Sequence, residues 1–123
     1  MVVAGAALVG ALPAGPAPGA AGPSRLLVAG DEWNVVLSRA KIVRGHALIQ
    51  FINRGEDDHD LRLRRISRSG SSHNPVARWR VTRPGELSSL ELRLRTGRYR
   101  LWCSLPGHRG LGMRATLRVS ARR

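Results

Sequence analysis

The chain has 123 residues, a formal net charge of +13 and few aromatic side chains. This length fits one domain with a two-layer core and excludes a second lobe. The single cysteine, Cys103, excludes an intrachain disulfide framework and a multi-cysteine zinc site. The positive charge is compatible with three kinds of partner: a nucleic acid, an acidic membrane surface or an acidic protein.

The first 24 residues consist mainly of Ala, Gly, Pro, Val and Leu and carry no charged side chain. Residues 2–12 resemble the apolar core of a secretory signal, although the basic residue that usually precedes such a core is missing. Residues 17–21 supply small residues suited to cleavage. The apolar run is shorter than the ~20 residues that a membrane-spanning helix needs. We predict a signal peptide over residues 1–24, with a disordered Ala/Pro/Gly-rich segment as the alternative.

From Arg25 onward, apolar and polar residues alternate with a period of two, which is typical of half-buried β-strands. The segments with this pattern or with a short apolar run are residues 26–28, 33–37, 42–43, 46–52, 59–63, 77–82, 90–94, 99–103 and 113–119. Turn-forming residues separate them, and no segment has a sustained helical period. The pattern predicts one all-β domain over residues 25–123, an antiparallel Greek-key β-sandwich of about seven to eight strands.

The parity of the strands indicates which side chains point into the core, because residues two apart share one face. His59, Cys103 and Met113 each share a face with the apolar residues of their own segment. Each of the three also stands at an end of its segment. We therefore predict that these side chains point inward and share one site. Asp60 has the opposite parity to His59 and is predicted to lie on the outer face.

One short stretch, residues 99–113, contains Cys103, His108 and Met113 with the spacing Cys-x4-His-x4-Met. Copper selects these ligand types, and a blue copper site takes two His, one Cys and a weakly bound axial Met. The stretch supplies three of these four side chains, and His59 is the best candidate for the fourth. Taken singly, each residue has a plainer interpretation, such as a buried cysteine that only packs. The combination favours a site for one type 1 copper ion.

The sequence resembles the cupredoxins, the small blue copper proteins that include plastocyanin and azurin. The matching stretches are Phe51-Ile-Asn-Arg-Gly-Glu-Asp-Asp-His-Asp-Leu61 and Leu101-Trp-Cys-Ser-Leu-Pro-Gly-His-Arg-Gly-Leu-Gly-Met113. The likeness extends over roughly residues 26–119. It implies that the equatorial copper ligands are His59, Cys103 and His108 and that the axial ligand is Met113.

Position 60 departs from the cupredoxin pattern, because many cupredoxins have Asn after the first histidine and this chain has Asp60. The aspartate can still accept a hydrogen bond from Ser104. An ionised carboxylate beside the metal would favour the more positive Cu(II) state. We therefore expect a lower reduction potential than an asparagine would give.

The resemblance implies a function as well as a fold. We expect a one-electron carrier that cycles between Cu(II) and Cu(I) in the periplasm or outside the cell, and not an enzyme. His108 is the expected electron port, within a small apolar patch formed by Leu105, Pro106, Leu111 and Gly112. The outward arginines indicate an acidic redox protein as partner. We expect a monomer that binds no nucleic acid, and association with a membrane surface stays open.

Two other functions remain alternatives. A periplasmic copper carrier or chaperone that delivers the metal would have the same fold and ligands. A basic nucleic-acid-binding β-domain is suggested by the charge, but the few, dispersed aromatic residues would form a poor stacking platform. An enzyme is disfavoured because the four ligands would saturate the metal and no group is apparent that would orient Cys103 as a nucleophile.

Overall fold

A computed structural model describes residues 2–7, 9–12, 22–67, 69 and 75–122 of the chain. Residues 2–7 and 9–12 are exposed and belong to no helix or strand. The cleavage segment predicted at residues 17–21 lies outside the described residues. In the part of the chain that the structure describes, no helix is long and apolar enough to cross a membrane.

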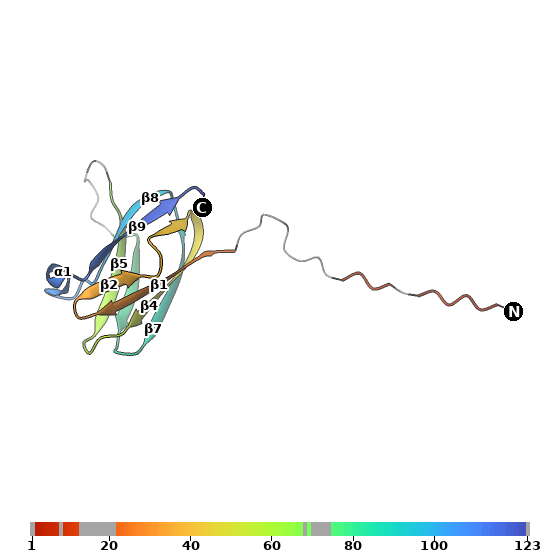
Figure 1. The fold of residues 1–123 in the computed structure, drawn as a ribbon, viewed down its shortest axis with the longest axis horizontal. Helices are drawn as coiled ribbons and strands as arrows, with labels where there is room; N and C mark the ends of the chain where they lie inside the picture. The colour runs from red at the N-terminus through yellow and green to blue at the C-terminus, as the bar shows by residue number, and fades with distance from the viewer. Residues whose placement is uncertain (1, 8, 13–21, 68, 70–74, 123) are drawn as a thin grey trace.

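From Ser24 to Ser120, the described residues form nine strands and one single-turn helix, arranged as one body (Figure 1). In chain order these are β1 (Ser24–Asp31), β2 (Asn34–Leu37), β3 (Lys41–Val43), β4 (Gly45–Asn53), β5 (His59–Arg65), β6 (Ala77–Thr82), β7 (Leu87–Leu94), β8 (Gly97–Trp102), α1 (His108–Leu111) and β9 (Arg114–Ser120). The predicted all-β class is confirmed. The strand number is slightly higher than expected, because β3 and β6 each form a strand of their own.

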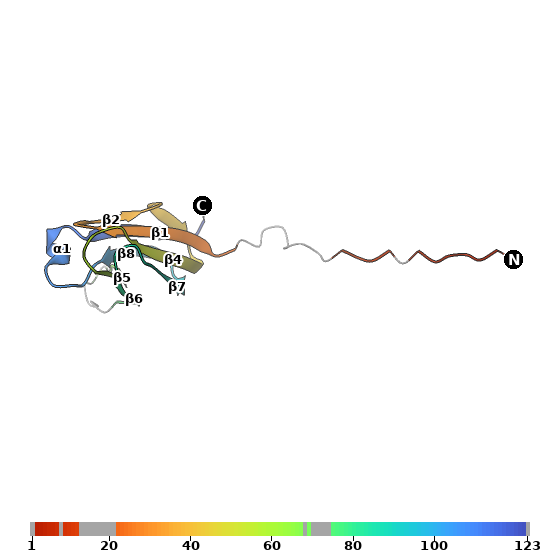
Figure 2. The ribbon, with the colours of Figure 1, turned by 90° about the horizontal axis from the view of Figure 1, so that it is seen from below.

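The strands form two sheets that pack against each other, with the orders β2-β1-β4-β7 and β3-β9-β8-β5-β6 (Figure 2). Most neighbouring strands are antiparallel, as the sequence predicted. The pairs β1–β4 and β3–β9 are parallel instead. The chain changes sheets between β2 and β3 and again between β3 and β4, so these parallel neighbours are not joined by hairpins.

The core lies between the two sheets and is built from the alternating apolar positions of the strands. Its fully buried members include Val28, Ile49, Phe51, Leu61, Leu63, Leu101 and Leu117. Each such side chain contributes about 1.5–3 kcal/mol by leaving water. On the edge strand β6, the indole N–H of Trp79 donates to the carbonyl of Ile49 in the other sheet at 3.0 Å. This bond joins the two layers.

The turn between β4 and β5 is shaped by Asn53, which is fully buried. Its amide nitrogen donates to the carbonyls of Asp57 and Thr82 at 2.7 and 2.8 Å. Its amide oxygen accepts the N–H of Gly55 at 2.8 Å. A single side chain thus folds the turn onto itself and ties it to β6, which fixes the point where β5 begins at His59.

Replacing Asn53 with alanine should therefore destabilise the fold. The change removes three hydrogen bonds and leaves buried backbone groups without partners, so we expect a loss of about 3 kcal/mol in the free energy of unfolding. Urea denaturation measures this change in the free energy of unfolding. The control is Asn34→Ala, which removes one exposed hydrogen bond to Asp31 and should cost well under half as much. Equal losses in the two variants would contradict the role given to Asn53.

Candidate metal centre

Three side chains with metal-binding atoms meet at one end of the sandwich: His59 at the start of β5, Cys103 directly after β8, and His108 at the start of α1. The Nδ1 atoms of the two histidines are 3.2 Å apart. The sulfur of Cys103 lies 3.9 Å from Nδ1 of His59 and 3.6 Å from Nδ1 of His108. Residues separated by up to 49 positions in the sequence are thus brought into one triangle.

The size of this triangle suits a metal ion. The point inside it that is equally far from the three atoms lies about 2.1 Å from each, within the ~2.0–2.3 Å range of metal–nitrogen and metal–sulfur bonds. Two imidazoles and a thiolate are ligands for a borderline or soft transition metal. The residues present therefore fit such an ion.

Met113 lies directly before β9 and is fully buried. Its carbonyl accepts the N–H of Cys103 at 3.1 Å, and its own N–H donates to the carbonyl of His108 at 3.2 Å. These two bonds place the backbone of Met113 beside two members of the cluster. The backbone position of Met113 is therefore compatible with the fourth-ligand role predicted from the sequence.

The loop after Cys103 contains the single helical turn α1, which the sequence analysis did not predict. Glycines flank this turn: Gly107 has a φ of 80° and Gly112 a φ of 129°, conformations that favour glycine. A Cβ on Gly112 would lie 2.8 Å from the carbonyl oxygen of Trp33. Small residues thus let the loop turn tightly and bring His108 back over the cluster.

Trp33 was predicted as part of a strand and instead lies in the turn between β1 and β2. Its ring stands edge-on to both imidazoles, with centroids 4.8 Å from His108 and 6.3 Å from His59. The indole therefore covers one side of the cluster. No sequence pattern indicates this role, because a large apolar residue in an alternating segment is typical of any core position.

Glu32 is a further residue of the site that the sequence analysis missed. Its Oε1 atom lies 2.8 Å from Nε2 of His59. The carboxylate also accepts the backbone N–H groups of Asp57 and Glu56, at 2.8–3.1 Å. A Cβ on Gly55 would overlap this carboxylate in its present position, so a larger residue there would displace it.

The backbone N–H of Asp57 is the largest of several hydrogen bonds that lower the pKa of Glu32 to about 2. Glu32 is therefore ionised at neutral pH and accepts a hydrogen bond from Nε2 of His59. With the proton on Nε2, the lone pair of Nδ1 points toward Cys103 and His108. The Glu32 carboxylate thus stabilises the His59 tautomer whose Nδ1 can bind a metal.

Asp60, predicted on the outer face of β5, is only 2% exposed. The ligand loop covers it: the backbone N–H and the hydroxyl of Ser104 donate to its two oxygens at 2.6 and 2.5 Å. The hydrogen bond expected from Ser104 is therefore present. Arg62 lies 3.2 Å from the same carboxylate and partly balances its charge.

Burial also raises the pKa of the Cys103 thiol above its ordinary value. A buried thiol resists ionisation because the low-dielectric surroundings disfavour a bare thiolate. A bound cation supplies the opposite charge and favours the thiolate form. The environment of Cys103 thus suits a metal ligand better than a free nucleophile.

Solved structures with this architecture include several copper proteins. A dithionite-reduced auracyanin from the photosynthetic bacterium Roseiflexus castenholzii superposes with a TM-score of 0.64 at 17% identity, covering 80% of this chain and 99% of that chain. Auracyanin A, a blue copper protein from Chloroflexus aurantiacus, superposes with a TM-score of 0.63 at 17% identity, covering 80% of this chain and 100% of that chain. The chain has the cupredoxin fold. In this fold the triangle of His59, Cys103 and His108 lies at one end of the sandwich.

A multicopper oxidase also shares the cupredoxin fold, with a TM-score of 0.58 and 15% identity. The match covers 79% of this chain but 44% of the oxidase. No family model matches the sequence, and no curated protein matches it either. At these identities the likeness establishes the fold alone.

Replacing Glu32 with glutamine should weaken metal binding. The substitution keeps the shape of the side chain but removes the charge that holds the Nε2 proton of His59, and loss of such a supporting partner typically lowers metal affinity 10- to 100-fold. Competition titrations with Co(II) as a spectroscopic probe measure the change. Glu91→Gln, on the exposed face of β7, is the matched control and should leave affinity unchanged. An unaltered affinity in the Glu32 variant would refute the positioning role.

Proposed function

We propose that this chain is a blue copper protein that carries single electrons. His59, Cys103 and His108 would be the equatorial ligands of one copper ion and Met113 the axial ligand. The observation that carries the proposal is the triangle of two Nδ1 atoms and one sulfur atom, whose centre is at bonding distance from all three. The blue copper proteins among the structural neighbours support it at the level of the fold.

Copper, when bound, supplies the one-electron chemistry by alternating between Cu(II) and Cu(I). The chain's own residues would keep the ligands in one arrangement during that change. Glu32 holds the ring of His59, and Asp60 holds the loop after Cys103 through Ser104. Ligands that are already fixed need little rearrangement, which favours fast electron transfer.

His108 is the proposed electron port. His59 and Cys103 are fully buried, whereas His108 is partly exposed. The neighbouring Pro106 is exposed, and Leu111 is 58% exposed. An apolar patch around a partly exposed ligand would let a redox protein approach closely and exclude water from the contact.

An electron carrier accounts for the site better than an enzyme does. Within the described residues, only one group of clustered metal-ligating side chains is found, and the four proposed ligands leave no open position for a substrate. We also propose export from the cytoplasm, which the uncharged apolar residues 2–12 support.

Addition of Cu(II) to the purified full chain should produce an intense thiolate-to-copper absorption in the visible region and narrow hyperfine splitting in the EPR spectrum. Cys103→Ser should abolish both signals, because the thiolate is their source. Rapid electron self-exchange between the Cu(I) and Cu(II) forms would then support a carrier of electrons over a carrier of copper. A colourless protein, or an ordinary tetragonal Cu(II) signal, would refute the blue copper proposal.

Asp60→Asn should raise the reduction potential of the copper-loaded protein. Removing a buried negative charge near the metal destabilises Cu(II) relative to Cu(I), and the expected rise is on the order of tens of millivolts because Arg62 offsets part of the charge. Voltammetry measures the reduction potential of each variant. In Asp58→Asn, the matched control, the charge removed is exposed and screened, so the potential should hardly move. An equal or lower potential in the Asp60 variant would contradict the argument.

A further inference from the structure

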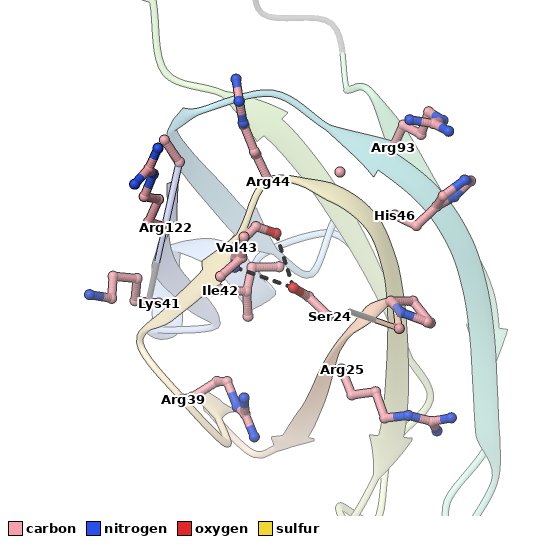
Figure 3. A pocket seen from close by; sticks show the side chains of 14 residues that line it. Ser24, Arg25, Arg39, Lys41, Ile42, Val43, Arg44, His46, Arg93 and Arg122 are labelled. Carbon is pink, nitrogen blue, oxygen red and sulfur yellow. Dashed lines mark hydrogen bonds between the residues drawn. The ribbon is translucent and has the colours of Figure 1, made fainter. Parts of the chain in front are cut away.

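A basic pocket of about 1050 Å³ lies at the end of the sandwich where β1, β3 and β4 meet (Figure 3). Six cationic side chains and no acidic one line it: Arg25, Arg39, Lys41, Arg44, Arg93 and Arg122. Ser24 ties the start of β1 to β3, since its hydroxyl donates to the carbonyl of Val43 at 3.0 Å and accepts the N–H of Val43 at 3.3 Å. The strands that carry the cations are thus joined to one another.

The cations of the basic pocket have no ion-pair partner among the described residues. Within the described part of the chain, none of the six side chains forms an ion pair or a hydrogen bond. Like charges around one hollow raise the local positive potential and attract anions. The basic pocket is therefore suited to a ligand that brings several negative charges.

The basic pocket does not merely reflect the average charge of the chain. All but one of the eight acidic residues lie in or beside the turns at the opposite end of the strands: Asp31, Glu32, Glu56, Asp57, Asp58, Asp60 and Glu86. The remaining one, Glu91, lies in the middle of β7, opposite Leu48. The acidic residues are thus concentrated at the end of the sandwich away from the basic pocket.

The basic pocket is also far from the candidate metal centre. Ser24 lines the pocket and Asp31 ends the same strand beside Glu32, so the two sites are separated by roughly 23 Å along β1. Figure 1 shows α1 at one end of the body and the start of β1 at the other. An electron-transfer partner seated in the basic pocket would therefore be remote from His108.

We propose that the basic pocket binds the anionic headgroups of a phospholipid membrane. The six cations of the lining supply the charge that such headgroups attract, and Gly22 and Pro23 in the same lining place the start of the body at this pocket. Basic side chains gathered on one surface bind an anionic membrane by electrostatic attraction, so the proposal does not require residues 2–12 to be retained. In this orientation His108 faces away from the membrane. The proposal concerns a separate site and holds whether or not the chain binds copper.

The test is co-sedimentation of the full chain with vesicles of phosphatidylcholine alone or mixed with phosphatidylglycerol. The pocket variant carries Arg25→Gln, Lys41→Gln and Arg44→Gln. The control carries Arg54→Gln, Arg78→Gln and Arg83→Gln, which lower the net charge equally at exposed positions outside the basic pocket. We expect the pocket variant to bind phosphatidylglycerol vesicles ~100-fold more weakly than the unsubstituted chain does. The affinity of the control variant should stay within a few-fold of that of the unsubstituted chain.

Three results would overturn the proposal. Equal weakening in both variants would mean that the net charge acts diffusely. Equal binding to the two kinds of vesicle would mean that anionic headgroups are not recognised. Binding of inorganic phosphate and of a short DNA duplex is measured as well. If the pocket variant lost binding to either of these but still bound phosphatidylglycerol vesicles, the basic pocket would be assigned to another ligand. A second variant, Arg93→Gln with Arg122→Gln, probes the same pocket through other residues, and circular dichroism checks that each variant is folded.

Discussion

The hydrogen bond between Glu32 and His59 is the contact on which the metal end of this molecule depends. It joins the turn after β1 to the turn before β5, because the same carboxylate also accepts backbone N–H groups from Glu56 and Asp57. One ionised side chain therefore orders a loop and selects the tautomer of an imidazole at the same time. A neutral acceptor in this place would leave both the loop and the ring less firmly held.

Further hydrogen bonds extend this order around the site. Asp60 fixes the loop after Cys103 through two bonds to Ser104, and the backbone of Met113 is bonded to Cys103 and His108. The clustered side chains are thus supported by elements that the core already holds in place. Most of the conformational entropy needed to order these side chains is lost when the sandwich folds. A metal ion that enters the site therefore meets donor atoms that need little movement.

The sequence predicted those features that are encoded locally. The period of two in leucine and valine positions revealed both the strands and their inner faces, and three ligand types within one short loop indicated copper. Glu32 could not be found in this way, since it lies 27 residues from His59 and an isolated carboxylate has no pattern. The turn α1 depends on loop closure around Gly107 and Gly112, and the burial of Asp60 depends on a loop that folds over it; neither leaves a periodic trace.

The distribution of charge differs between the two ends of the sandwich. Exposed charges are screened beyond about 8–10 Å at physiological salt, so the net charge of +13 matters less to a docked partner than the groups nearest to it. Around His108 those groups are of both signs: Arg109 and Arg114 lie on the side of α1, while Glu56 to Asp58 lie on the side of the turn before β5. Such a divided surface favours one orientation of a partner over others, because a rotated partner would bring like charges together.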